Sequence, residues 1–533
     1  MSVRNSISLL VALSTLLFLA ACGGSSSPKA VPPPSGGFSK SSLSGTYVFS
    51  TSGSESTAGL ALVLAGAFTA NGAGGITGGS LDVADGNSGV QPTQTVTGGS
   101  YTISVDGRGL ATLDTAIGNF SLDFVLTSNT HGLVTEFDTF GSGSGTLDLQ
   151  PGTVSQATLT GLTFGLTGVG TTSSFATVGT VTLDPSGNVT TGFEDFNNGG
   201  SPTTNQPVPT TSFITVGTGT APGTAQLVTP FGTLHFDVYA VDSTHLKLTE
   251  TDGTFILSGD AFTPGTTLPA SSTIAFTLGG FDSVNLPLAV AGTLPLDANS
   301  AISAGGVEDY NDNGIINQST TITGGFSAIS GGRSTLTLTG FVNGAANDVA
   351  STYTFAAYPF TSNGVSGVEL LEIDSSGAIG FNGVTVGTTF VQTSTSIAAS
   401  QGYGLNLSGI NITNGVTAFF EEDDIAEFTT TSTGFAGIVD LNDEGTTTFD
   451  QSLSGSYTAP SGGRGTFTTS NFVNGNFYAV NGSTLLVLET DSNQIGLGIF
   501  EQQGGSGIPG AVQSSSVSVL RPVSPHGFLS RRK

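Results

Sequence analysis

The chain has 533 residues, 79 of which are glycine, and a formal net charge of −27 at pH 7. A chain of this length needs more than one hydrophobic core, and its glycines follow no Gly-X-Y period, which excludes collagen. Residues 41–513 hold all 38 acids but only four of the 11 lysines and arginines, so their field repels nucleic acid and anionic membrane surfaces. We therefore expect no nucleic-acid partner.

Residues 1–21 have the pattern of a signal peptide, in which Arg4 precedes an apolar run from Ile7 to Ala20. The run is short for a membrane span. It closes with Leu19-Ala20-Ala21-Cys22, and Cys22 is the only cysteine of the chain. These four residues resemble the lipobox of bacterial lipoproteins, which implies cleavage before Cys22 and lipidation of its thiol and new amino group. The alternative is an ordinary secretory signal with an incidental cysteine.

Residues 22–40 have the composition of a tether, rich in Ser, Pro and Gly. In lipoproteins of diderm bacteria, Gly rather than Asp after the lipidated cysteine goes with delivery to the outer membrane. Because Gly23 follows Cys22, the resemblance implies a lipid-anchored protein of the cell envelope at the outer membrane, with its periplasmic or surface face left open. Residues 514–533 contain four bases and no acid, and we expect a disordered tail there.

Four copies of one pattern fill the rest of the chain, and their clearest element is a strand that ends in Glu-x-Asp. Alternation of apolar and polar residues predicts a β-strand, in which every second side chain shares a face. Two residues before each Glu stands an apolar residue, so the Glu is predicted to lie on the apolar face. The four segments are Gly132 to Asp138, Leu246 to Asp252, Val368 to Asp374 and Leu485 to Asp491.

Each copy contains about eight short apolar strands separated by Gly, Asn and Asp turns, which is typical of an up-and-down meander. The predicted fold class is all-β, with four tandem antiparallel modules that are each an up-and-down barrel or a sandwich. The modules are predicted at residues 41–151, 152–270, 271–392 and 393–513. A continuous sheet or solenoid shared between copies is the alternative. The Gly-Thr-Tyr opening and the glycine-rich hairpins resemble modules of repeat lipoproteins of soil bacteria, a resemblance that carries no binding residue.

A carboxylate on an apolar face needs a partner, a proton or a ligand. Copies 1, 3 and 4 each place one arginine in the same glycine-rich hairpin, whereas copy 2 has Pro222-Gly223-Thr224 there. We predict buried pairs of Glu136 with Arg108, Glu372 with Arg333 and Glu489 with Arg464. Paired carboxylates that act on a glycan are the alternative, which we disfavour because catalytic sites are seldom repeated in every tandem module.

The acidic turns are a second candidate site. Asp309, Asn311 and Asn313 have the spacing of oxygen ligands in a calcium loop, but Thr320 stands where the closing Glu belongs. Hairpin turns use the same residues, so turn chemistry is favoured over a weak cation-binding site. Glu421-Glu422-Asp423-Asp424 is predicted to be a solvated acidic loop, and the four histidines are predicted to form no site.

The sequence contains no phosphate-binding loop, no dinucleotide-binding fingerprint, no zinc-ligand spacing and no nucleophile elbow. We therefore expect that the protein binds no cofactor and is not an enzyme. The leading hypothesis is a non-enzymatic, lipid-anchored envelope protein for adhesion, scaffolding or weak binding of a glycan, protein or cation. A secreted glycan hydrolase with paired carboxylates is the alternative.

Overall fold

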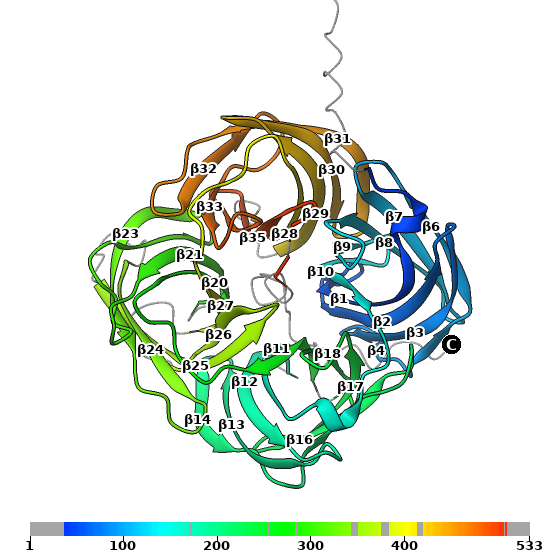
Figure 1. The fold of residues 1–533 in the computed structure, drawn as a ribbon, viewed down its shortest axis with the longest axis horizontal. Coiled ribbons are helices and arrows are strands. Elements are labelled where there is room, and N and C mark those ends of the chain that lie inside the picture. The colour runs from blue at the N-terminus through cyan, green and yellow to red at the C-terminus, as the bar shows by residue number, and fades with distance from the viewer. Residues whose placement is uncertain are drawn as a thin grey trace, which may run out of the picture. The chain divides into compact units, whose positions relative to one another are not determined.

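Antiparallel β-strands make up most of the chain in the computed structural model (Figure 1). The structure describes residues 37–508 except 171–172, 254, 283–284, 343–349, 375–382, 413–418 and 506. Cys22, the tether before residue 37 and the basic tail 514–533 lie outside the described residues. The described part also has two short 3-10 helices, η1 (Lys40–Ser42) and η2 (Gln156–Thr158).

The strands close into four barrels, which we number 1 to 4 in chain order. Barrel 1 comprises β1 (Ser44–Glu55), β2 (Ala61–Asn71), β3 (Gly75–Asp85), β4 (Gly89–Val90), β5 (Gln94–Val96), β6 (Gly98–Ile103), β7 (Arg108–Asp114), β8 (Asn119–Leu126), β9 (His131–Phe137) and β10 (Gly141–Gln150). Pairing of β1 with both β2 and β10 closes it, and the short strands β4 and β5 lie against β3.

Barrel 2 closes through pairing of its first strand with its last. Its strands are β11 (Gly161–Val169), β12 (Ser174–Leu183), β13 (Val189–Asn198), β14 (Ser201–Pro207), β15 (Phe213–Ile214), β16 (Gly223–Thr229), β17 (Gly232–Ala240), β18 (His245–Glu250) and β19 (Ile256–Pro264).

Barrels 3 and 4 have eight strands each and close in the same way. The strands of barrel 3 are β20 (Thr273–Phe281), β21 (Pro287–Pro295), β22 (Gly306–Asp312), β23 (Ile315–Phe326), β24 (Ser334–Val342), β25 (Ala350–Ser362), β26 (Val365–Glu372) and β27 (Val384–Val391). Those of barrel 4 are β28 (Gly402–Ile412), β29 (Phe419–Thr430), β30 (Gly434–Asp443), β31 (Thr446–Tyr457), β32 (Arg464–Thr469), β33 (Gly475–Ala479), β34 (Thr484–Glu489) and β35 (Gln494–Gln502).

The predicted all-β fold with four tandem modules is confirmed, and the modules are barrels rather than sandwiches. The solenoid alternative is wrong because each barrel closes on itself. Within the described residues, a two-residue ladder between Thr263–Pro264 of β19 and Phe360–Thr361 of β25 continues the sheet from barrel 2 to barrel 3. The predicted module boundaries near residues 152, 271 and 393 lie between the last strand of one barrel and the first strand of the next.

Side chains fill the inside of every barrel, because alternate residues of each strand point inward. Each barrel has its own cluster of buried apolar residues. Large members of these clusters are Phe49, Phe68 and Phe124 in barrel 1, Phe164, Phe196 and Phe236 in barrel 2, Phe276, Tyr310 and Phe355 in barrel 3, and Tyr403, Phe428 and Phe477 in barrel 4.

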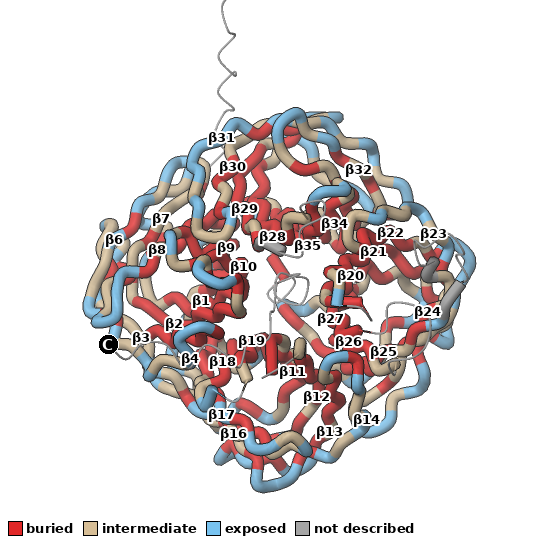
Figure 2. The backbone as a smooth tube through the Cα atoms, turned by 180° about the vertical axis from the view of Figure 1, so that it is seen from behind, coloured by how far each residue is buried: buried red, intermediate tan, exposed pale blue. Residues whose placement is uncertain are grey.

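The outer faces of the strands also bury residues where the barrels meet. A further cluster joins side chains of all four barrels, among them Leu133, Phe262, Phe360 and Ile499. Strand contacts connect barrel 1 with 2, 2 with 3, 3 with 4 and 4 with 1, as Figure 1 also shows. Figure 2 shows buried residues toward the middle of the four barrels and exposed loops around the outside. The acidic and basic side chains at these junctions form the candidate functional site.

Candidate functional site: the junctions between barrels

The glutamates of the Glu-x-Asp strands lie inside the barrels, as the alternation predicts. Glu136, Glu250, Glu372 and Glu489 are each at most 1% exposed. Burial raises the pKa of Glu372 well above its ordinary value, although a hydrogen bond from the hydroxyl of Thr385 opposes the shift. Burial likewise raises the pKa of Glu250 to about 9. Burial thus favours the neutral form of these carboxyl groups, which lessens the need for a cation beside them.

The predicted pairs of these glutamates with arginines of the same barrel are wrong. Arg333 binds Asp195 of barrel 2 instead of Glu372, and Arg464 binds Asp309 of barrel 3 instead of Glu489. Arg108 binds Asp106 of its own hairpin together with Asp440 and Asp450 of barrel 4, instead of Glu136. The reason is strand parity: the glutamates point into the barrels, whereas the arginines lie on outer faces where a neighbouring barrel supplies the carboxylate.

The junctions from barrel 2 to 3 and from barrel 3 to 4 share one arrangement of Asp, Arg and Tyr. The guanidinium of Arg333 donates to both oxygens of Asp195 at 2.6 and 2.7 Å, and Tyr358 donates its hydroxyl to the same carboxylate at 2.5 Å. Arg464 donates to Asp309 at 2.6 and 3.1 Å, and Tyr478 also donates to Asp309. Bidentate pairing of this kind is strong and directional.

The acidic turns also belong to these junctions. The side-chain amide of Asn311 donates to the carbonyls of Asp491 and Gln494 in barrel 4, at 3.0 and 2.8 Å. Asn313 and Gly314 have positive φ, which is the geometry of a tight hairpin turn. The predicted weak cation site at Asp309, Asn311 and Asn313 is therefore wrong, because donors already occupy Asp309 and Asn311 binds backbone of another barrel.

The predicted solvated acidic loop is also wrong. Residues 421–424 are part of β29, and Asp423 is fully buried between barrels 4 and 1. The hydroxyls of Ser142 and Ser144 in barrel 1 donate to its two oxygens at 2.5 and 2.7 Å. Burial raises the pKa of Asp423 to about 7, although these hydroxyls oppose the shift.

The junction between barrels 1 and 2 uses a buried lysine. The ammonium group of Lys247, fully buried on β18, lies 3.3 Å from Asp260 of its own barrel and 3.5 Å from Asp148 of barrel 1. It also donates to the hydroxyl of Thr146 at 2.6 Å. Burial alone would raise the pKa of Asp148 and of Asp260, but nearby cations outweigh burial and lower both. All four bases of residues 41–513 are thus placed at junctions between barrels.

Two histidines extend this cluster, which corrects the prediction that the histidines form no site. The Nδ1–H group of His131 donates a hydrogen bond to Asp148 at 2.6 Å, and its Nε2–H group donates to Glu501 of barrel 4 at 2.8 Å. Burial alone would lower the pKa of His131, but Glu501 and Asp148 outweigh it and raise the pKa to about 10. His131 is therefore an imidazolium with both ring nitrogens occupied, and it joins barrels 1 and 4.

His131 and His245 line one cavity of ≈ 200 Å³, to which barrels 1, 2 and 3 contribute. His245 binds Asp260 through Nε2 at 2.7 Å and stacks on Phe262, while its Nδ1 has no hydrogen-bond partner among the described residues. The cavity exceeds the roughly 15 Å³ that one water needs. It can hold water or a small polar molecule. Two carboxylates line it: Asp148 is bound by His131, Lys247 and Thr146, and Asp242 accepts from the backbone N–H and the hydroxyl of Thr244.

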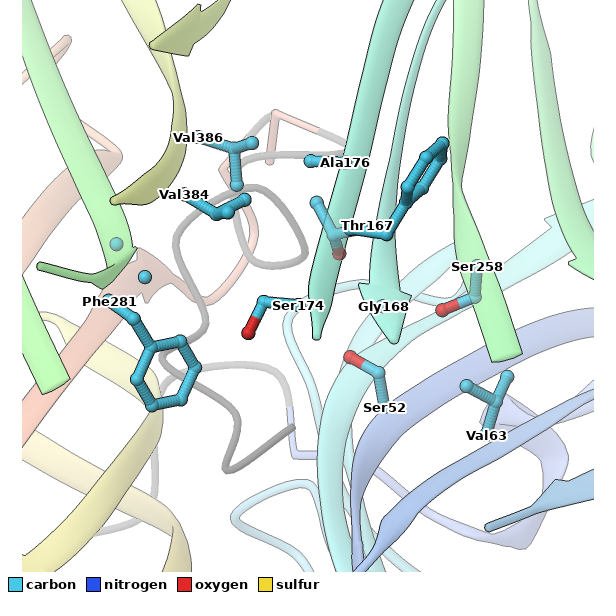
Figure 3. Close-up of a pocket in the computed structure, with 13 residues that line it drawn as sticks. Ser52, Val63, Thr167, Gly168, Ser174, Ala176, Ser258, Phe281, Val384 and Val386 are labelled. Atoms are coloured by element: carbon cyan, nitrogen blue, oxygen red, sulfur yellow. The ribbon is translucent and has the colours of Figure 1, made fainter. Parts of the chain in front are cut away.

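Figure 3 shows a second, smaller pocket of ≈ 30 Å³ between barrels 1, 2 and 3. Its labelled lining includes Val63, Phe281, Val384 and Val386 together with the hydroxyls of Ser52 and Ser174. The lining contains no charged side chain, so this pocket offers no acid–base chemistry.

The described residues contain neither a cluster of metal ligands nor a helix that could span a membrane. No cluster of three or more His, Cys, Asp and Glu side chains there is placed to hold a metal ion. None of the helices within the same residues is long and apolar enough to span a membrane.

No family model matches the chain, and no curated protein does. Among solved structures, the chain is similar to a single mutant of the vaccine antigen transferrin binding protein B from Haemophilus parasuis Hp5. The identity is 9%, the match covers 72% of this chain and 86% of that chain, and the TM-score is 0.20. Intact Ap-TbpB, with its N and C lobes, is 10% identical over 90% of this chain and 98% of that chain, with a TM-score of 0.17. Likenesses of this size carry no functional argument.

Proposed function

We propose that this chain is a lipid-anchored, non-enzymatic protein of the cell envelope in which four barrels act together as a scaffold. One observation carries the scaffold role: all four bases of residues 41–513 join one barrel to the next. Buried ion pairs between surfaces fix orientation and register more than they add stability. The barrels are accordingly expected to work as one assembly on the outer membrane, and the filled barrel interiors favour binding at outer surfaces over binding in a lumen.

The buried carboxylates favour this role over glycan hydrolysis. A hydrolase needs two carboxyl groups that a sugar can reach from opposite sides of one bond. Glu136, Glu372 and Glu489 are at most 1% exposed and recur in separate barrels, and Asp195 and Asp309 are covered by arginines. A glycan, protein or cation partner on the outside of the barrels remains part of the proposal.

The anchoring is tested by replacing Cys22 with serine. We expect wild type in the membrane fraction and Cys22→Ser in the soluble fraction, because the variant lacks the only thiol to which lipid can be attached. Mass spectrometry of the wild-type N-terminus should show a modified Cys22 as the first residue. A wild-type protein without lipid, or equal membrane association of both proteins, would contradict the proposal.

A further inference from the structure

The carboxylate on the third long strand of each barrel has the same place at all four junctions. These residues are Asp82, Asp195, Asp309 and Asp440, on β3, β13, β22 and β30. Three of them bind an arginine of the next barrel, which is Arg333 for Asp195, Arg464 for Asp309 and Arg108 for Asp440. Asp82 differs, because no ion pair of the described residues involves it.

Strand register shows what replaces the arginine at Asp82. In barrel 4, Arg464 lies opposite Tyr478 on the neighbouring strand. The counterpart of Tyr478 in barrel 2 is Tyr239, whose hydroxyl donates to Asp82 at 2.7 Å. Gly223 pairs with Val238, so the residue opposite Tyr239 is Pro222. A proline side chain has no hydrogen-bond donor, so Pro222 places no guanidinium beside Tyr239 and Asp82.

A second donor is missing from Asp82 as well. At the other three junctions the backbone N–H ten residues further along donates to the carboxylate, from Asn205 to Asp195, from Ser319 to Asp309 and from Asp450 to Asp440. Ten residues after Asp82 stands Pro92, which has no N–H. Oδ1 of Asp82 accordingly has no hydrogen-bond partner among the residues that the structure describes, although Asp82 is only 3% exposed.

Barrel 2 adds a carboxylate at this place instead of a donor. Asp237 occupies the strand position that in barrel 4 holds Asn476, whose amide donates to Asp309 at 2.9 Å. Oδ2 of Asp237 accepts from the hydroxyl of Thr93 at 3.0 Å. Two carboxyl groups therefore face one another across this junction, whereas each of the other three junctions holds a guanidinium.

We propose that Asp82 and Asp237 form a binding site for a guanidinium cation supplied from outside the chain, in the place that Arg333 and Arg464 fill at their junctions. At two other junctions the equivalent Asp accepts from both a guanidinium and a tyrosine hydroxyl, so this protein already contains the recognition geometry. The side chains of Arg333 and Arg464 are 16% and 19% exposed, so the bound guanidinium group contacts solvent at each of those two junctions. Asp237 supplies the additional negative charge.

The test is equilibrium dialysis of the full-length chain against isotope-labelled methylguanidinium at pH 8. We expect one saturable site in wild type. Asp82→Asn and Asp237→Asn should each weaken binding by about tenfold or more, since each removes one partner of a charge pair. Pro222→Arg should abolish binding because it supplies the guanidinium from the chain itself. Asp297→Asn, an exposed acid in a turn, is the matched control and should bind as wild type does.

The source of the cation is resolved by a second probe, an acetylated Gly-Arg-Gly amide. Equal affinity for both probes assigns the site to a free small molecule, and tighter binding of the peptide assigns it to an arginine side chain of another protein. Circular dichroism checks that every variant is folded. Absence of saturable binding to wild type, or unchanged binding in folded Pro222→Arg, would overturn the proposal.

Discussion

Lys247→Met should destabilise the protein by about 3–5 kcal/mol, the cost of removing one partner from a buried ion pair. The ammonium group has no exposed surface and lies between Asp148 and Asp260, which are themselves at most 5% exposed. Without it, two buried carboxylates face one another across the junction of barrels 1 and 2. The midpoint of urea denaturation, followed by circular dichroism, measures the loss.

Two comparisons make the lysine experiment specific. Lys40→Met replaces an exposed lysine and should leave the midpoint within the range of ordinary surface substitutions, about 0.5 kcal/mol. The double variant Lys247→Leu with Asp260→Thr copies Leu133 and Thr146, the residues at the same strand positions of barrel 1. It should lose less stability than Lys247→Met, because it also removes one of the two buried carboxylates beside the lysine. Equal midpoints of wild type and Lys247→Met would contradict the structural role of the cluster.

Stability should fall as the pH rises from about 5 to 9. Burial raises the pKa of Glu136, Glu372 and Glu489 well above the ordinary value and that of Glu250 to about 9. The native state thus binds more protons than the unfolded chain, whose glutamates titrate near about 4.3. Stability is then complete below that value and is lost as the pH rises through the native pKa values.

His131 acts in the same direction. Its pKa is raised to about 10, so its contribution is present below the ordinary histidine value of about 6.5 and is lost as the pH approaches 10. Each unit of raised pKa corresponds to about 1.4 kcal/mol, so a few such groups account for several kcal/mol. Urea midpoints at pH 5, 7 and 9 should therefore decrease in that order.

Glu250→Gln tests which groups cause the pH dependence. The variant cannot ionise at this buried position, so it should match wild type near pH 5 and exceed it in stability at pH 9. Asp297→Asn, at an exposed turn, should leave the profile unchanged. A midpoint that rises between pH 5 and 9 would show that the interior glutamates are ionised in the folded protein.

Local pattern was enough to predict the strands, the four copies and the position of the glutamates. Alternation placed Glu372 on the same face as Leu370, and the structure buries both in the interior of barrel 3. Successive side chains point to opposite faces of a strand, whether one face is exposed to solvent or both faces are packed against other residues. Alternation therefore could not reveal that Glu421-Glu422-Asp423-Asp424 is a buried strand, because its outer face is covered by barrel 1, far away in the sequence.

The sequence by itself determined the all-β fold, the fourfold repetition and the scarcity of bases, because these follow from residue order and composition. Only the tertiary structure decided which carboxylate each base binds. Arg333 and Asp195 are separated by 138 residues and belong to different barrels, and they meet at 2.6 Å because outer strand faces pack against each other. Charge pairs across a junction have no sequence spacing of their own, since the packing of one closed barrel on the next sets the distance between them.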